Sequence, residues 1–240
     1  MIVQFIPSLI LIAGTFTVSC QVKYMQGKDL GINTEYVIGF PMPSVNDDQY
    51  ETHEASVESF KEALRDHTTI KSIGGTSNLP GGDGSDINST TGSIRIIGLT
   101  DRVEGTTYIQ FIDDHFIEAV DMEVQAGRNF DRKMQSDSSA IIVNQAFLRK
   151  FNIYDPESAV NEEIQFGSDE DNDKYQIIGI VKDFNRTSLK SSVEPSLYLP
   201  WLNPSSTVIS FQPNQYREGI AFLEEKWAEF FPMRPWTMSF

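Results

Sequence analysis

Three adjacent residues, Asp113, Asp114 and His115, carry side chains that could act together in acid–base chemistry. A carboxylate beside an imidazole can orient the ring so that it activates a nucleophile. No serine or cysteine in a recognisable nucleophile context accompanies them, so a secreted hydrolase is only a minor alternative. An aspartate before a short helix also satisfies free backbone N–H groups. We therefore expect Asp113 or Asp114 to cap a helix, and we predict no catalytic residue.

Two other segments suggest ligand binding but do not have the required spacing. Residues 169, 171 and 173 are carboxylates, as at the start of a calcium loop, but Lys174 replaces the required Gly and Ile180 the required Glu. Residues 81–86 (GGDGSD) are glycine-rich, yet no Lys-Ser or Lys-Thr follows to complete a phosphate loop. We expect both segments, 81–86 and 168–174, to be exposed loops, and we predict neither a metal nor a cofactor.

The composition excludes several classes of protein. Of 240 residues, 19 are Lys or Arg and 34 are Asp or Glu, which gives a net charge of −15. Such a chain repels phosphate backbones, so we expect no nucleic-acid partner. The single cysteine, Cys20, rules out a disulfide within one chain. Sixteen Phe, eight Tyr and three Trp are enough for a packed core, either one domain or one domain with an inserted subdomain.

The first 22 residues carry no charge and are mostly apolar. As a helix they would rise about 33 Å, enough to cross a bilayer, and we expect one transmembrane helix. A signal peptide is an alternative, although the basic start of such peptides is missing. In a variant of that alternative, Cys20 is the acylated residue of a lipoprotein. A helix buried in a soluble domain is the third possibility.

Both ends of the remaining chain predict a strand–helix–strand unit. The expected strands are 35–43, 70–78, 207–212 and 236–240, and the expected helices are 52–67 and 214–231. One face of each helix is apolar, which predicts that the two units pack together through Val57, Phe60, Leu64, Ile220, Leu223 and Trp227. The opposite face of the first helix is polar, and we expect Glu58, Lys61, Glu62 and Arg65 to be exposed there.

The middle of the chain has a different pattern, typical of an inserted subdomain. We expect strands at 93–99, 106–112, 164–166 and 175–181, and short helices at 115–120 and 141–151. Two motifs follow or end strands and invite a functional interpretation, Ala126–Phe130 (AGRNF) and Lys182–Asn185 (KDFN). A structural interpretation is simpler for both: Gly127 frees a turn, Asp183 caps one, and the phenylalanines are anchors.

These motifs occur in one order along the chain. The order is QFxxSLxLIxGT, YMQGKDLGINTEYVI, LPGG, AGRNF, AIIVNQAFLRKF, IIGIVKDFNRTSLKSSVEP and LEEKWAEFFPMRPWTMSF. In this order and spacing the sequence resembles the extracytoplasmic domain of FtsX-like/MacB-like ABC transporter permeases of the Bacteroidetes type. The resemblance covers essentially the whole chain, and AGRxF, VNxAF and GIVKDFxxxSL together are its most specific part.

The resemblance implies a fold: an α+β MacB-like periplasmic core domain preceded by a transmembrane helix at residues 1–22. It also implies a porter-like subdomain, split into residues 23–85 and 167–240, around an inserted subdomain at residues 86–166. Because complete permeases have further spans, the resemblance implies that this chain is a fragment.

The resemblance also implies a function: a non-catalytic domain at the cell inner membrane that couples ATP hydrolysis, by a separate cytoplasmic ABC ATPase, to substrate export or periplasmic signalling. Further permease copies, as a dimer, and a periplasmic partner or substrate are implied with it. The alternative from a different class is a lipid-anchored periplasmic binding or adhesion protein acylated at Cys20.

Overall fold

The computed structural model describes residues 2–26, 36–43, 50–79, 88–98, 101–167, 174–184, 193–201, 205–232, 234 and 236. The chain divides into two units, Met1–Leu30 and Gly31–Phe240, which are described separately.

In the first unit the structure describes one helix, α1 (Ile2–Gln26). It is continuous, as the sequence predicts, and its described apolar side chains are exposed, with 57–72% of their surface accessible: Leu9, Ile10, Leu11, Ile12, Phe16 and Val18. Among the residues that the structure describes, no helix has both the length and the apolar character that a membrane crossing requires. The helix is therefore confirmed, and the predicted transmembrane span is not.

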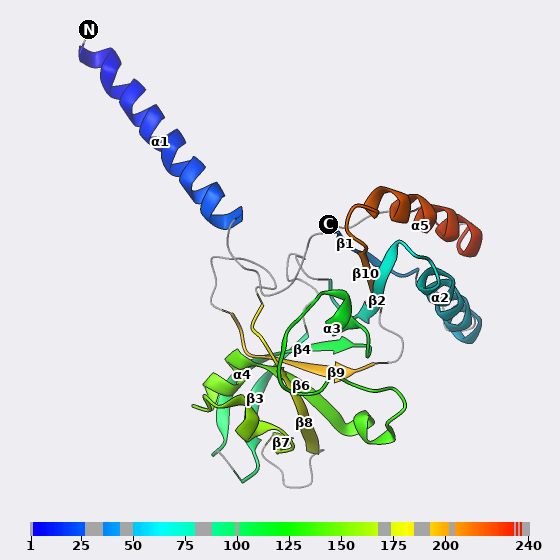
Figure 1. The fold of residues 1–240 in the computed structure, drawn as a ribbon. Helices are drawn as coiled ribbons and strands as arrows, with labels where there is room; N and C mark the ends of the chain where they lie inside the picture. The colour runs from blue at the N-terminus through cyan, green and yellow to red at the C-terminus, as the bar shows by residue number, and fades with distance from the viewer. Residues whose placement is uncertain are drawn as a thin grey trace. The chain divides into compact units, whose positions relative to one another are not determined.

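The second unit is built on one sheet, in the order β1-β10-β2-β4-β3-β7-β8-β6-β9, with β5 paired to β8 (Figure 1). The strands are β1 (Val37–Pro41), β2 (Ile70–Thr76), β3 (Asn88–Ile96), β4 (Val103–Ile112), β5 (Val124–Gly127), β6 (Ala140–Asn144), β7 (Glu163–Phe166), β8 (Lys174–Val181), β9 (Ser196–Pro200) and β10 (Ser206–Phe211). Because β9 also pairs with β4, in parallel, the strands β4-β3-β7-β8-β6-β9 close into a ring.

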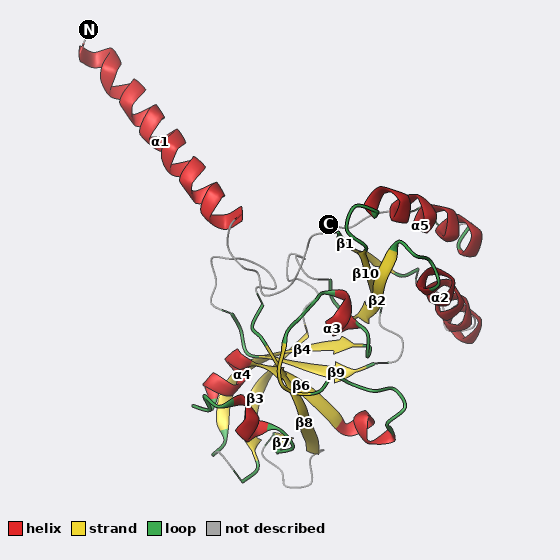
Figure 2. Cartoon of the chain, viewed as in Figure 1, coloured by secondary structure: helices red, strands yellow, loops and turns green. Residues whose placement is uncertain are grey.

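Strands β1, β10 and β2 extend from this ring as a three-stranded sheet. Helices α2 (Tyr50–Arg65) and α5 (Tyr216–Phe230) lie side by side and pack against it (Figure 2). The core between them contains Phe40, Phe60 and Trp227. The Trp227 ring meets those of Phe40 and Phe60 edge to face, with ring centroids 5.6 and 5.8 Å apart. The two terminal units therefore pack together, and Trp227 is only 6% exposed, as the sequence predicts.

The short helix α3 (Phe116–Ala119) packs against β2 and β10. The contact with β2 is close: a Cβ at Gly74 would lie 2.4 Å from the Cα of Phe116, so only glycine fits there. Phe116 belongs to a core that also includes Tyr198 of β9 and Val208 of β10. The three-stranded sheet and the ring of strands therefore share buried apolar side chains.

The two parts of the sheet are joined by a short antiparallel pairing of β2 with β4, in which Thr76 lies opposite Ile112. Beside it, the buried Gln110 donates from Nε2 to Thr76 Oγ1 (2.7 Å) and to the carbonyl of Asn78 (3.0 Å). A buried amide without partners would cost free energy, so these bonds favour this register.

One predicted element was wrong. Residues 141–151 were expected to be a helix, but they begin within β6, and the helix α4 (Gln145–Lys150) starts only after Asn144. All five residues of β6 are buried, because its alternate side chains enter two different cores: Ala140 and Ile142 lie in one, and Ile141 and Val143 in the other. A short apolar run of this kind has no helical periodicity to distinguish it. The described residues also include the 3₁₀ turns Gln135–Ser139 and Pro156–Ala159.

Other boundaries differ in smaller ways. Strands β5 and β9 were not predicted, and the expected closing strand 236–240 lies outside the described residues except for Trp236, which is in no strand. Strand β8 pairs with β5, β6 and β7, and strand β9 pairs with β4 and β6. The expected boundary at residue 167 assigned both strands to the second part of the porter-like subdomain. Lys61, expected to be exposed, is 2% exposed.

Replacing Trp227 by Ala should lower the free energy of unfolding by about 3–5 kcal/mol, because a large buried aromatic side chain would leave a cavity. Chemical denaturation of the full chain measures the change. Glu225→Ala, at an exposed position of the same helix, is the matched control and should change stability by about 0.5 kcal/mol or less. Equal effects of the two substitutions would contradict the core position of Trp227.

Candidate functional site

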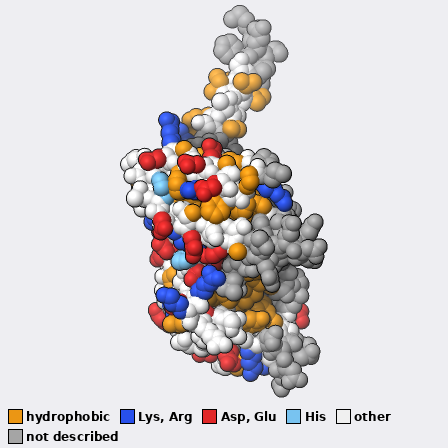
Figure 3. Space-filling model, turned by 90° about the vertical axis from the view of Figure 1, so that its right-hand side faces the viewer, with side chains coloured by type: hydrophobic (Ala, Val, Ile, Leu, Met, Phe, Trp, Pro, Cys, Tyr) orange, Lys and Arg blue, Asp and Glu red, His pale blue; other side chains and the backbone are white. Residues whose placement is uncertain are grey.

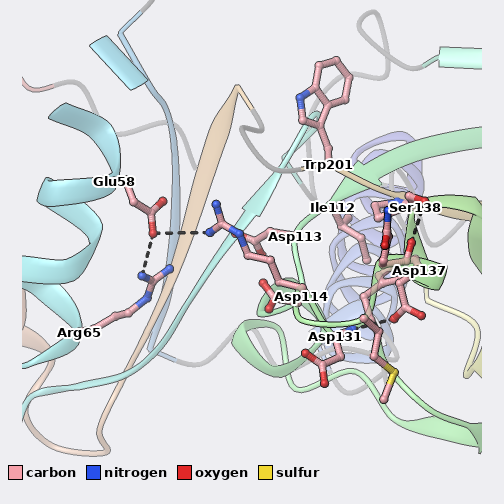
Figure 4. A pocket seen from close by; sticks show the side chains of 14 residues that line it. Glu58, Arg65, Ile112, Asp113, Asp114, Asp131, Asp137, Ser138 and Trp201 are labelled. Atoms are coloured by element: carbon pink, nitrogen blue, oxygen red, sulfur yellow. Dashed lines mark hydrogen bonds and ion pairs between the residues drawn. The ribbon is translucent and has the colours of Figure 1, made fainter. Parts of the chain in front are cut away.

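A cleft of about 370 Å³ lies in the second unit (Figure 4). Its walls are α2, the end of β4 with the turn after it, the segment 130–138 and the end of β9. The lining residues are Glu58, Arg65, Ile112, Asp113, Asp114, Phe130, Asp131, Arg132, Met134, Gln135, Asp137, Ser138, Pro200 and Trp201. Four segments that are distant in the sequence thus meet at one place.

A buried ion pair lies at the base of the wall formed by α2. Lys61 Nζ is 3.7 Å from Asp113 Oδ2, and the two side chains are 3% and 10% exposed. Burial raises the pKa of the Asp113 carboxyl above its usual range, while Lys61 and nearby backbone N–H groups act in the opposite direction. The pair ties α2 to the end of β4, since leaving either charge buried alone would be costly.

The three residues first considered for catalysis lie in and beside the turn between β4 and α3. His115 Nε2 is 3.9 Å from Asp114 Oδ1, and the His115 side chain is 45% exposed. Asp113 Oδ1 accepts a hydrogen bond from the backbone N–H of His115, at 3.1 Å. The N-cap of α3 is His115 itself, so the expected capping by Asp113 or Asp114 is corrected to a turn that precedes the helix.

The AGRNF motif shapes the opposite wall of the cleft. Gly127 has φ +72°, and a Cβ there would lie 2.2 Å from the carbonyl oxygen of Ile178. Arg128 then donates two hydrogen bonds of 2.7 Å to the carboxylate of Asp137. This contact lowers the pKa of Asp137 and raises that of Arg128.

The last two residues of the motif fix the same wall. Asn129 Nδ2 donates to the carbonyl of Asp114 at 2.7 Å, and its Oδ1 accepts from the N–H of Phe130. Phe130 is 7% exposed. The positive φ of Gly127 and the burial of Phe130 agree with the structural interpretation, and the motif holds the segment that lines the cleft.

The other two characteristic motifs also have structural roles, both around α4. Asn144 Oδ1 accepts hydrogen bonds from the N–H groups of Phe147 and Ser196, each at 2.9 Å. Asp183 Oδ1 accepts from the N–H of Ala146 at 2.7 Å. Both side chains therefore satisfy amides in the first turn of α4. Phe184, the next residue after Asp183, is buried.

Several predicted features cannot be placed. Residues 81–86, 168–173 and Asn185 lie outside the described residues, whereas Lys174 begins β8. Cys20 is an exposed free thiol on α1. Among the described residues, no group of three or more His, Cys, Asp or Glu side chains could hold a metal ion.

Sequence analysis missed two residues of this region. Lys61 falls on the polar face of α2 in the helical pattern, and nothing local shows that Asp113 covers it. Asp137 lies in a polar run, MQSDSS, that looks like an exposed loop, yet its side chain is only 6% exposed. Arg128, a cation in a motif that contains no acidic residue, was the signal that could have pointed to a buried acid.

The fold is that of a mixed α/β domain, in which a closed ring of strands carries a three-stranded sheet with two helices. Several charged residues of its cleft form ion pairs. The MacB-like periplasmic core domain family matches residues 30–223, so the chain belongs to this family. The domain is therefore of the periplasmic type found in ABC transporter permeases, which confirms the resemblance.

Of two solved structures that are similar to this chain, only the first is similar enough to support the fold. The periplasmic region of MacB from Actinobacillus actinomycetemcomitans is 12% identical, with a TM-score of 0.50 over 83% of this chain and 85% of that one. The extracellular domain of the ABC-type transporter YknZ from Gram-positive bacteria is 16% identical, with a TM-score of 0.45 over 79% of this chain and 93% of that one. No curated protein sequence matches.

Asp137→Asn should destabilise the protein by about 1–3 kcal/mol at neutral pH, because the isosteric amide loses the charged hydrogen bonds to Arg128. The folded pKa of Asp137 lies below its unfolded value, so its contribution is present above about pH 4 and is lost as the pH falls through the folded pKa. Denaturation curves of parent and variant should therefore converge on acidification. Asp131→Asn, a half-buried neighbour, is the control, and a stability difference that did not depend on pH would contradict the argument.

Proposed function

We propose that this chain is a non-catalytic extracytoplasmic domain of an ABC transporter permease. In this proposal it couples ATP hydrolysis by a separate cytoplasmic ATPase subunit to substrate export or periplasmic signalling, and it acts with a second permease copy. The family match over residues 30–223 carries the proposal. The porter-like subdomain in this proposal is the sheet β1-β10-β2 with α2 and α5, and the ring of strands is the inserted subdomain.

The ion pairs of the cleft support a role without catalysis. Asp113 is engaged with Lys61, and Asp137 with Arg128, so these carboxylates act within the fold. His115 is half exposed and contacts a carboxylate only at 3.9 Å. A general base needs a shorter hydrogen bond to an orienting partner and to a nucleophile.

We further propose that α1 anchors the chain to the inner membrane, with the second unit on the periplasmic side. The support is the set of exposed apolar side chains along the helix, since water is a poor solvent for such a surface. The acidic and basic side chains of the second unit lie among hydrophobic ones on the face seen in Figure 3. With a net charge of −15, the chain is not suited to lie flat on anionic lipid.

The partner prediction is tested by crosslinking in the native membrane. The tagged chain should be recovered with an ATPase that contains a phosphate loop, identified by mass spectrometry, and a parallel assay of the purified chain should show no hydrolysis of ester, peptide, glycoside or phosphate substrates. Hydrolysis that His115→Ala abolishes, without a change in thermal stability, would establish the hydrolase alternative instead.

The anchoring prediction is tested by flotation with liposomes. The full chain should float with the lipid, and replacing Leu11 and Ile12 by Lys should reduce the floating fraction several-fold, because charges at these exposed apolar positions are costly in lipid. Ala221→Lys, at an exposed position of α5, is the control and should have no effect.

Intact-mass spectrometry of the membrane-derived chain distinguishes the two anchors. Retention of the segment before Cys20 supports anchoring by the helix. A diacylated Cys20 without residues 1–19 would instead establish the lipoprotein alternative.

A further inference from the structure

The cleft has fixed walls. On one side, the buried pair Lys61–Asp113 holds α2 against the end of β4. On the other side, Arg128 binds Asp137, and Asn129 binds the carbonyl of Asp114, so the segment 130–138 is held at both ends. The cavity of about 370 Å³ therefore exists before any ligand enters, and its size is within the range of small-ligand pockets.

Positive charge is in excess on the α2 side. Glu58 Oε1 is 3.1 Å from Arg65 Nη1 and 3.9 Å from Arg132 Nη1, so one carboxylate faces two guanidinium groups (Figure 4). The three side chains are 32–52% exposed. A guanidinium presents several N–H donors in one plane and can bind a further carboxylate. This side of the cleft is thus suited to an anionic group.

Negative charge and apolar surface occupy the rest of the cleft. Asp114 and Asp131 both line the cleft. In Figure 4 their carboxylates lie to the right of the Glu58–Arg65 pair, away from it. Ile112 and Phe130 provide a buried apolar base. Trp201 and Met134 are 45% and 46% exposed at the lining, so both offer apolar surface to a ligand in the cleft.

We propose that the cleft binds a short peptide with two free ends and an apolar side chain. The C-terminal carboxylate binds Arg132 and Arg65, the N-terminal ammonium faces Asp114 and Asp131, and the apolar side chain packs on Trp201 and Met134. The inference goes beyond the proposed transporter role and does not depend on an ATPase, so it can fail while that role stands.

Isothermal titration of the full chain in lipid nanodiscs, with the tripeptide Ala-Leu-Ala as the probe, tests the proposal. We expect saturable binding at millimolar peptide or below. Amidation of the C-terminus and acetylation of the N-terminus should each weaken binding about tenfold, because each removes a charge-assisted hydrogen bond. Ala-Ser-Ala should also bind more weakly, because it lacks the apolar side chain.

Variants connect binding to the cleft. Arg132→Gln should weaken the binding of Ala-Leu-Ala about tenfold and leave the affinity for its C-terminal amide unchanged. Arg217→Gln, which removes the same charge at an exposed position of α5, should have no effect. Equal melting temperatures exclude a folding defect. The absence of saturable binding, equal affinity for either end-modified peptide, or an equal effect of the two arginine substitutions would each overturn the proposal.

Discussion

The antiparallel pairing of Thr76 with Ile112 is the contact on which the arrangement of the second unit depends. It is short, and the buried amide of Gln110 finds its partners, Thr76 and the carbonyl of Asn78, only in this register. The chain leaves β4 immediately afterwards, which brings Asp113 beneath α2 and within reach of Lys61. The position of the cleft therefore follows from the place where two sheets join.

The three motifs that characterise the sequence have a common role in this geometry. Each motif has a polar side chain that forms hydrogen bonds with another part of the chain. Arg128 binds the buried carboxylate of Asp137. Asn144 accepts a hydrogen bond from the N–H of Ser196 in β9, and Asp183 accepts one from the N–H of Ala146 in α4. Such residues look like catalytic residues in a sequence, because they are polar and follow strands. In the structure they determine the fold, which is the expected pattern for a family defined by its architecture.

Much of the fold was predictable because its two helices have clear apolar faces. Phe60 and Trp227 point to the core by their spacing alone, and both are buried there. Strand β6 was mistaken for a helix because burial on both sides removes the alternation that identifies a strand. The cleft could not be predicted, because Arg65, Asp113, Arg132 and Trp201 lie on separate segments and only the tertiary fold brings them together.

The order of the strands has a consequence for biogenesis. Val37 of β1 pairs with Ser210 of β10, and β10 is the only described strand beside β1, so β1 emerges from the ribosome long before its neighbour. The ring of strands lies entirely between them in the sequence and can assemble first. Until β10 arrives, the apolar edge of β1 is open to pairing with other chains. A nascent chain with this topology therefore has a late step of strand insertion, during which shielding of its N-terminal strand determines whether it folds or aggregates.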